Sequence, residues 1–119
     1  MLTLSNVDAG YGSFQALFGA SLEVNAGEAV AVIGPNGAGK TTLMRVISGL
    51  IPARGGSMVL EGTDLVQTEP YRIVELGIAH VPENRRLFPR MTVEDNLRMG
   101  AFIPAARAKF EERLAFVYD

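Results

Sequence analysis

One segment of eight residues, Gly34–Thr41, restricts the possible folds of this chain more than any other feature. Its sequence, Gly-Pro-Asn-Gly-Ala-Gly-Lys-Thr, fits the pattern G-x-x-x-x-G-K-[ST] at every fixed position. Composition alone would produce roughly 0.002 such matches in a chain of this length. The continuous apolar run Ala29–Ile33 precedes the segment, and an apolar stripe of helical period, Leu43–Leu50, follows it. The sequence therefore predicts a parallel strand buried on both faces, a glycine-rich turn and an amphipathic helix.

Such a turn is suited to binding a chain of phosphates. Glycines let the backbone bend tightly and approach an anion with no Cβ in the way, and a helix N-terminus adds unpaired N–H groups. In this pattern Lys40 is expected to reach the β- and γ-phosphates, and the Thr41 hydroxyl to ligate Mg²⁺. The alternative is a glycine-rich turn that binds nothing. The predicted cofactor-binding residues of the turn are Gly34, Pro35, Asn36, Gly37, Ala38, Gly39, Lys40, Thr41 and Thr42.

The other segments predict an α/β fold that ends in a helical portion. Alternating apolar residues at positions 2–4 and 22–24 indicate half-buried antiparallel strands, and Met58–Leu60 and Ile78–Val81 indicate short strands. Pro70 can open a short helix that Gly77 closes. Thr92–Asp95 has the pattern of a capping box, and a last helix can start at Pro104 with its apolar side running from Ala106 to Val117.

Composition excludes several classes of protein. With 48% apolar and 20% charged residues the chain is globular, and its net charge of −2 argues against binding to nucleic acid. The absence of cysteine and the single histidine exclude disulfides, thiol catalysis and a zinc cluster. No apolar run is long enough to cross a bilayer, and Met1–Leu4 has no signal-peptide character, so a cytoplasmic location is expected.

Several segments together resemble one family, the ABC-type ATPases. Gly34–Leu43 resembles their Walker A region, Asp8–Gly12 their A-loop, and Gly56–Gly62 the strand and turn after the Walker A helix. Val81–Leu97 is the most specific stretch, because it resembles the Q-loop and first helical segment of ATP-binding subunits of branched-chain amino acid uptake systems, the group called LivF. The resemblance implies a P-loop NTPase fold: the N-terminal part of an ABC-type nucleotide-binding domain, with an antiparallel β portion, the Walker A strand-loop-helix and the start of the helical subdomain.

The resemblance also implies roles for two residues outside the turn. Tyr11 would stack on the adenine ring of ATP, although from the residues alone it can equally be an ordinary turn tyrosine between two glycines. Glu83 would lie close to Mg²⁺ and the attacking water, acting with Lys40 in catalysis, and carboxylate oxygens suit this metal. The alternative for Glu83 is a loop acid paired with Arg85 or Arg86. Asn84 departs from the glycine of that group.

The implied organisation extends to domains and partners. Residues 1–91 would form the core portion and residues 92–119 the start of the helical subdomain. Partners would be a second ATP-binding subunit and membrane permease subunits, the latter contacted through the loop Glu83–Arg90. Such a chain would be cytoplasmic and peripheral on the inner face of the plasma membrane.

Two elements of a complete site of this family are not found in the sequence. It contains no Leu-Ser-Gly-Gly segment and no convincing Walker B strand: Val59–Glu61 follows Lys40 too soon, and Ala115–Asp119 keeps helical phase. His80, the only histidine, is interpreted as structural. We therefore expect an N-terminal half that binds ATP and Mg²⁺ but hydrolyses ATP inefficiently.

Three alternatives remain open. The first is a truncated nucleotide-binding module without ATPase activity. The second is a P-loop GTPase or small-molecule kinase, against which the absence of Asn-Lys-x-Asp and the stretch Val81–Leu97 both argue. The third is an ABC protein that does not serve transport.

Overall fold

The computed structural model describes residues 1–35, 39–82 and 87–118 of the chain. They form two compact units, Met1–His80 and Val81–Asp119. The first unit contains the sheet and the helix that follows the glycine-rich turn, and the second is helical.

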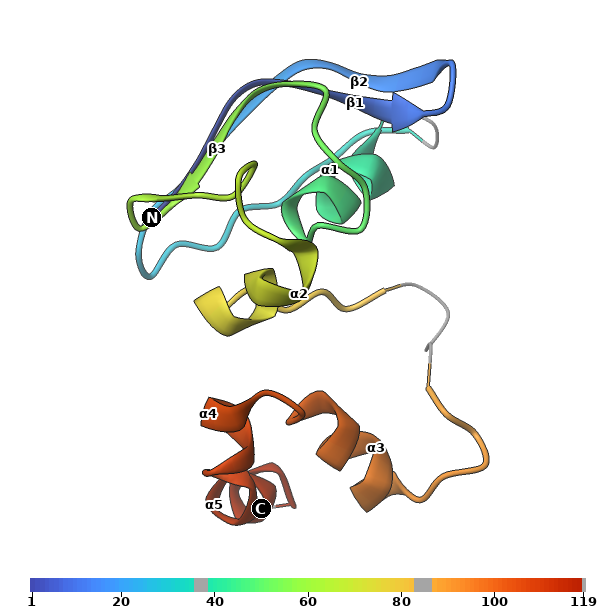
Figure 1. The fold of residues 1–119 in the computed structure, drawn as a ribbon, viewed down its shortest axis with the longest axis vertical. Coiled ribbons are helices and arrows are strands. Elements are labelled where there is room, and N and C mark those ends of the chain that lie inside the picture. The colour runs from blue at the N-terminus through green and yellow to red at the C-terminus, as the bar shows by residue number, and fades with distance from the viewer. Residues whose placement is uncertain (36–38, 83–86, 119) are drawn as a thin grey trace. The chain divides into compact units, whose positions relative to one another are not determined.

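A four-stranded antiparallel sheet with the order β2-β1-β3-β4 is the base of the first unit (Figure 1). The central strand β1 pairs with β2 from Leu2↔Val24 to Tyr11↔Phe14, and with β3 from Leu2↔Leu60 to Asp8↔Gly55. The antiparallel strands predicted at the start of the chain and at Met58–Leu60 are therefore confirmed, although they are longer than predicted. The strands are β1 Leu2–Tyr11, β2 Phe14–Val24, β3 Gly55–Leu60 and β4 Thr63–Asp64.

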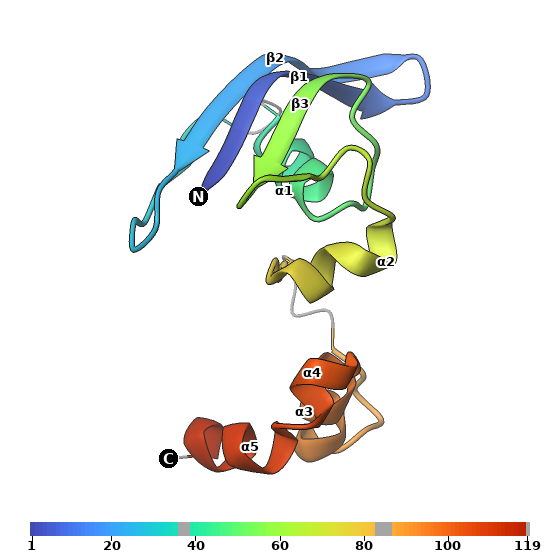
Figure 2. The same ribbon diagram turned by 60° about the vertical axis from the view of Figure 1, so that its left-hand side comes forward.

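Helix α1, Lys40–Ile47, packs on one face of this sheet (Figures 1 and 2). Its buried side chains, among them Leu43 and Val46, meet Leu4 and Val7 of β1 in one apolar cluster. Burying each such side chain contributes about 1.5–3 kcal/mol, so this contact holds the start of the helix against the sheet. The predicted stripe is confirmed within the helix, but Leu50 lies beyond its end and is 66% exposed.

Two predicted strands are not present. Ala29–Ile33 has no strand pairing, and Ile33 is 90% exposed instead of buried on both faces. Ile78–Val81 also has no strand structure. A parallel strand needs parallel neighbours and cover on both faces, and the sheet formed by the described residues is antiparallel throughout. The apolar pattern alone therefore does not make these segments strands, because a strand also needs a neighbouring strand to pair with.

The connection from β4 towards the second unit contains one short helical element. Helix α2, Pro70–Ile73, starts with proline at its first turn, continues into the 3₁₀ turn η1, Val74–Leu76, and ends at Gly77 with φ 99°. Pro70 fixes a helical φ and lacks the N–H that would be unpaired there, and glycine adopts the left-handed conformation without strain. Both predicted helix boundaries are confirmed.

The second unit consists of α3, Val93–Gly100, α4, Pro104–Arg107, and α5, Phe110–Tyr118. Thr92 Oγ1 accepts a hydrogen bond from Asp95 N at 3.0 Å, which confirms the predicted cap. The single helix predicted from Pro104 is two helices, because α4 ends at Arg107 and α5 begins at Phe110. Helix α5 continues through Tyr118, so residues 115–118 do not form a Walker B strand.

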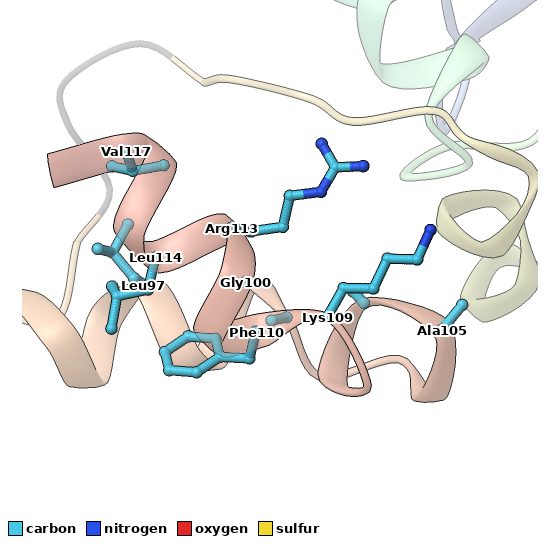
Figure 3. A pocket seen from close by; sticks show the side chains of 10 residues that line it. Leu97, Gly100, Ala105, Lys109, Phe110, Arg113, Leu114 and Val117 are labelled. Carbon is cyan, nitrogen blue, oxygen red and sulfur yellow. The ribbon is translucent and has the colours of Figure 1, made fainter. Parts of the chain in front are cut away.

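Apolar side chains of this unit surround a pocket of about 460 Å³. Its lining includes the predicted stripe, with Phe110 and Leu114 of α5 beside Leu97 of α3 (Figure 3). Across all the described residues, no helix is both long and apolar enough to span a membrane.

Candidate functional site

Lys40 is the first residue of α1 and follows a glycine in a left-handed conformation. Gly39 has φ 89° and ψ 6°, a backbone geometry that glycine tolerates best. No side-chain hydrogen bond caps α1, and its first turn has no acidic residue. Among the described residues, neither a capping side chain nor an acid in the first turn occupies this helix N-terminus, which favours an external anion there.

The lysine side chain is folded back over the turn that precedes it. Lys40 Nζ donates a hydrogen bond to the carbonyl oxygen of Gly34, so the first and seventh residues of the motif lie together. Both residues are half-buried. The structure describes six of the nine predicted cofactor-binding residues, Gly34, Pro35 and Gly39–Thr42. The other three, Asn36, Gly37 and Ala38, lie outside the described residues.

Gly39 also allows the turn to pack closely against the sheet. A Cβ at this position would lie 2.8 Å from the Ala16 carbonyl oxygen and 2.9 Å from Leu17 Cδ2. Both distances are closer than real Cβ contacts, so only glycine allows this approach of the turn to β2. The sheet thus fixes where α1 begins, and with it the position of Lys40.

The two threonines that follow Lys40 have different surroundings. Thr41 is exposed, so its hydroxyl is available to a metal ion. Thr42 is only 5% exposed, and its Oγ1 lies 3.4 Å from Tyr11 Oη. Thr42, predicted to bind the cofactor, therefore contacts the end of strand β1 in this structure.

Tyr11 lies at the end of β1, beside α1, and is held there by Arg45. Arg45 Nη1 donates to Tyr11 Oη at 2.9 Å, and its guanidinium carbon lies 6.0 Å from the centre of the tyrosine ring. Hydrogen bonding to Thr42, and then to Arg45, lowers the pKa of the Tyr11 phenol below its ordinary value. Tyr11 is still 40% exposed, so the structure brings a partly accessible aromatic residue next to the predicted phosphate site.

Two arginines that were not predicted from the sequence contact Tyr11 and the turn that follows it. Arg45 contacts the tyrosine itself, and Arg54 Nη2 donates to the carbonyl oxygen of Gly12, the next residue. The helical spacing between Thr41 and Arg45 places the arginine one turn beyond the phosphate-binding end of α1. That spacing was visible in the sequence, but the partner of Arg45 depends on how α1 packs against β1.

The residues present fit a nucleotide with Mg²⁺ in two respects. Lys40 and the exposed Thr41 lie in the first turn of α1, where no side chain of the described residues caps the N–H groups. Mg²⁺ keeps several waters and takes its remaining ligands from phosphates and one or two protein groups, so Thr41 can serve as a protein ligand beside the phosphates.

Glu83, Asn84, Arg85 and Arg86 lie outside the described residues, so the expected role of Glu83 at the metal stays a prediction. Arg90 is exposed in the second unit.

His80 is half-buried, and its Nδ1 lies 2.9 Å from Ser48 Oγ at the end of α1. We expect His80→Ala to lower the free energy of unfolding by about 0.5–1.5 kcal/mol, the usual contribution of one hydrogen bond. Urea denaturation followed by circular dichroism measures this, with nucleotide affinity expected to stay within about twofold. A large loss of affinity at unchanged stability would instead make His80 part of the site.

The antiparallel sheet and the helices of the described residues have the fold of an ABC-type nucleotide-binding domain. The chain belongs to the ABC transporter family, since residues 17–118 match the family model of that description. The fold expected from the sequence is thus confirmed for its antiparallel β portion, for the helix after the turn and for the helical segment.

Relatives are found among ATP-binding proteins of importers. The chain is 48% identical over 102 residues to the high-affinity branched-chain amino acid transport ATP-binding protein BraG of Pseudomonas aeruginosa, covering 86% of this chain and 44% of BraG. It is 39% identical over 99 residues to the sulfate/thiosulfate import ATP-binding protein CysA of Methylococcus capsulatus, covering 83% and 28%. The resemblance to the branched-chain group is confirmed by the first match.

A solved structure has the same fold. A nucleotide-free ATP-binding cassette from an ABC transporter superposes with a TM-score of 0.73 at 37% identity, over 87% of this chain and 41% of that one. The chain therefore spans less than half the length of these relatives.

Proposed function

We propose that this chain binds ATP together with Mg²⁺ and is part of the ATP-binding subunit of an importer for branched-chain amino acids. One observation carries the nucleotide-binding part of the proposal. Tyr11 lies beside α1, whose first residue is Lys40, so an aromatic platform and a phosphate-binding helix end are adjacent. A base and a triphosphate of one nucleotide could engage both at once.

Each residue has a separate role in this proposal. Lys40 contacts the β- and γ-phosphates, and Thr41 supplies one oxygen to Mg²⁺. The bound Mg²⁺ neutralises charge on the phosphates. Tyr11 stacks on the base. Glu83 supplies a further oxygen near the metal and the attacking water.

Transport of branched-chain amino acids is supported by the identity of 48% to BraG, against 39% to CysA. Because CysA is also a relative, import of sulfate or thiosulfate is the second candidate. In either case the partners are a second ATP-binding subunit and membrane permease subunits, contacted through the loop Glu83–Arg90 at the inner face of the plasma membrane. The slightly acidic net charge of −2 supports a protein partner over nucleic acid.

Binding and hydrolysis are tested separately. Isothermal titration is expected to show saturable binding of ATP with Mg²⁺, weaker binding when EDTA removes the metal, and no preference for GTP. Phosphate release from the 119-residue chain is expected to be slow, because the sequence offers a phosphate cradle without an Asp-Glu pair after an apolar strand. Fast release would contradict the second expectation and leave the first intact. An absence of any nucleotide binding would contradict the proposal itself.

A further inference from the structure

We propose that Arg45 is a positioning residue which holds Tyr11 as the platform for the nucleotide base, and so gives the site its preference for a nucleotide over a bare triphosphate. This inference rests on the proposed function. It concerns a residue outside the glycine-rich motif and goes beyond the phosphate contacts of that motif.

The first step is the hydrogen bonding of the Tyr11 hydroxyl. Arg45 Nη1 donates to Tyr11 Oη at 2.9 Å, and a guanidinium has no acceptor, so the direction of this bond is fixed. The phenol proton is then free to point to Thr42 Oγ1, 3.4 Å away. The hydroxyl is therefore contacted by Arg45 on one side and by Thr42 on the other, and these two contacts restrain the ring.

The second step concerns what this ordering does for a ligand. Tyr11 is 40% exposed at the end of a hairpin, where an unrestrained tyrosine would sample several rotamers. A base that stacks on a mobile ring must first order it, and this ordering opposes binding. Because Arg45 and Thr42 both belong to α1, the ring is ordered by the helix that starts with Lys40. The distance from base platform to phosphate site is then set before the nucleotide arrives.

The lowered pKa of the Tyr11 phenol supports the same geometry. Its causes are the hydrogen bond with Thr42 and then the one with Arg45, and the charge of Arg45 is a further contribution. In the free protein, a pH titration followed by the ultraviolet absorbance of phenolate should therefore show that Tyr11 ionises with a pKa below the ordinary value for tyrosine. Tyr11→Phe identifies this tyrosine by difference, and Arg45→Ala should raise its pKa.

The chain contains a matched control for Arg45. Arg72 on α2 makes the same kind of contact with an exposed tyrosine, donating to Tyr71 Oη at 3.4 Å and lying 5.5 Å from its ring centre. Arg72→Ala removes an arginine–tyrosine pair and one positive charge from the same unit without touching α1. It should leave every affinity below unchanged.

The decisive experiment compares ATP with inorganic tripolyphosphate, both with Mg²⁺, by isothermal titration. Arg45→Ala should weaken ATP binding roughly three- to tenfold, part of the contribution of one base stacked on an aromatic ring, and leave tripolyphosphate binding within about twofold. Tyr11→Phe, which keeps the ring but loses the hydroxyl, should weaken ATP binding to a similar degree. The double variant should lose no more than either single variant, because both remove the same restraint.

The other possible results of this titration would contradict either this inference alone or the proposed function as well. Equal losses for ATP and tripolyphosphate in Arg45→Ala would overturn this inference, since Arg45 would then act on the phosphates. Additive losses in the double variant would also overturn it. Unchanged ATP affinity in Arg45→Ala would overturn it while leaving the proposed function standing, whereas a wild-type chain that binds neither probe would overturn both.

Discussion

Replacing Lys40 with methionine is expected to weaken binding of ATP with Mg²⁺ by about 10- to 150-fold, because a hydrogen bond to a charged group contributes about 1.5–3 kcal/mol. Methionine keeps an unbranched apolar stem of similar length but loses the ammonium group. The first turn of α1 then presents only N–H groups and the Thr41 hydroxyl to the phosphates. Isothermal titration of the variant against the wild-type chain measures the loss.

The sequence supplies its own control, because it contains only one other lysine. Lys109 is exposed and belongs to the second unit, so Lys109→Met changes the net charge equally but alters no residue of the first unit. Its ATP affinity should match the wild type. Lys40 Nζ also donates to the Gly34 carbonyl oxygen, so a modest loss of stability, about 1 kcal/mol, should accompany Lys40→Met. Unchanged ATP affinity in Lys40→Met would refute the phosphate site and the function proposed from it.

The glycine-rich motif was the part of the site that the sequence could predict in detail. Its spacing fixes the residue types that a phosphate requires, and these requirements are local to one turn and one helix start. The helix start at Lys40 and the burial of Leu43, Val46 and Ile47 are as predicted. Local capping chemistry was equally predictable at Thr92, Pro70 and Gly77, because each depends on a few neighbouring residues.

The strands were less predictable, since pairing is not local. Ala29–Ile33 has the composition of a strand buried on both faces, yet it is exposed and unpaired. Composition indicates whether a segment can be buried. Strand pairing also needs a neighbouring strand that runs in the required direction and has unpaired backbone groups. The same reason explains why Ile78–Val81 is not a strand.

The contacts of Tyr11 could not be read from the sequence either. Family resemblance indicated a role for Tyr11, whereas from the residues alone it was equally a turn tyrosine. Its contacts with Thr42 and Arg45 connect positions more than thirty residues apart, through the packing of α1 on the sheet. Such contacts depend on the register of β1 with β2 and on the point where α1 begins, and only the folded structure defines both.

Replacing Gly39 with alanine is expected to lower the free energy of unfolding by about 2–5 kcal/mol, the largest effect we predict on stability. Two contributions add. A left-handed conformation costs a residue with a Cβ about 1–2 kcal/mol, and overpacking against well-placed neighbours costs about 1–3 kcal/mol. The overpacking arises because the new Cβ would lie 2.8 Å from the Ala16 carbonyl oxygen and 2.9 Å from Leu17 Cδ2. Urea denaturation followed by circular dichroism measures the loss.

Gly62 separates the two contributions, because its φ of 81° is close to the 89° of Gly39 but nothing lies within 4 Å of a Cβ built there. Gly62→Ala should therefore lose only the backbone part, about 1–2 kcal/mol. The excess loss in Gly39→Ala then measures how closely the turn approaches β2. That approach places the start of α1, so Gly39→Ala should also weaken ATP binding, whereas Gly62→Ala should not. Equal losses of stability in the two variants would mean that the turn does not rest on Ala16 and Leu17, and that the sheet does not set the position of Lys40.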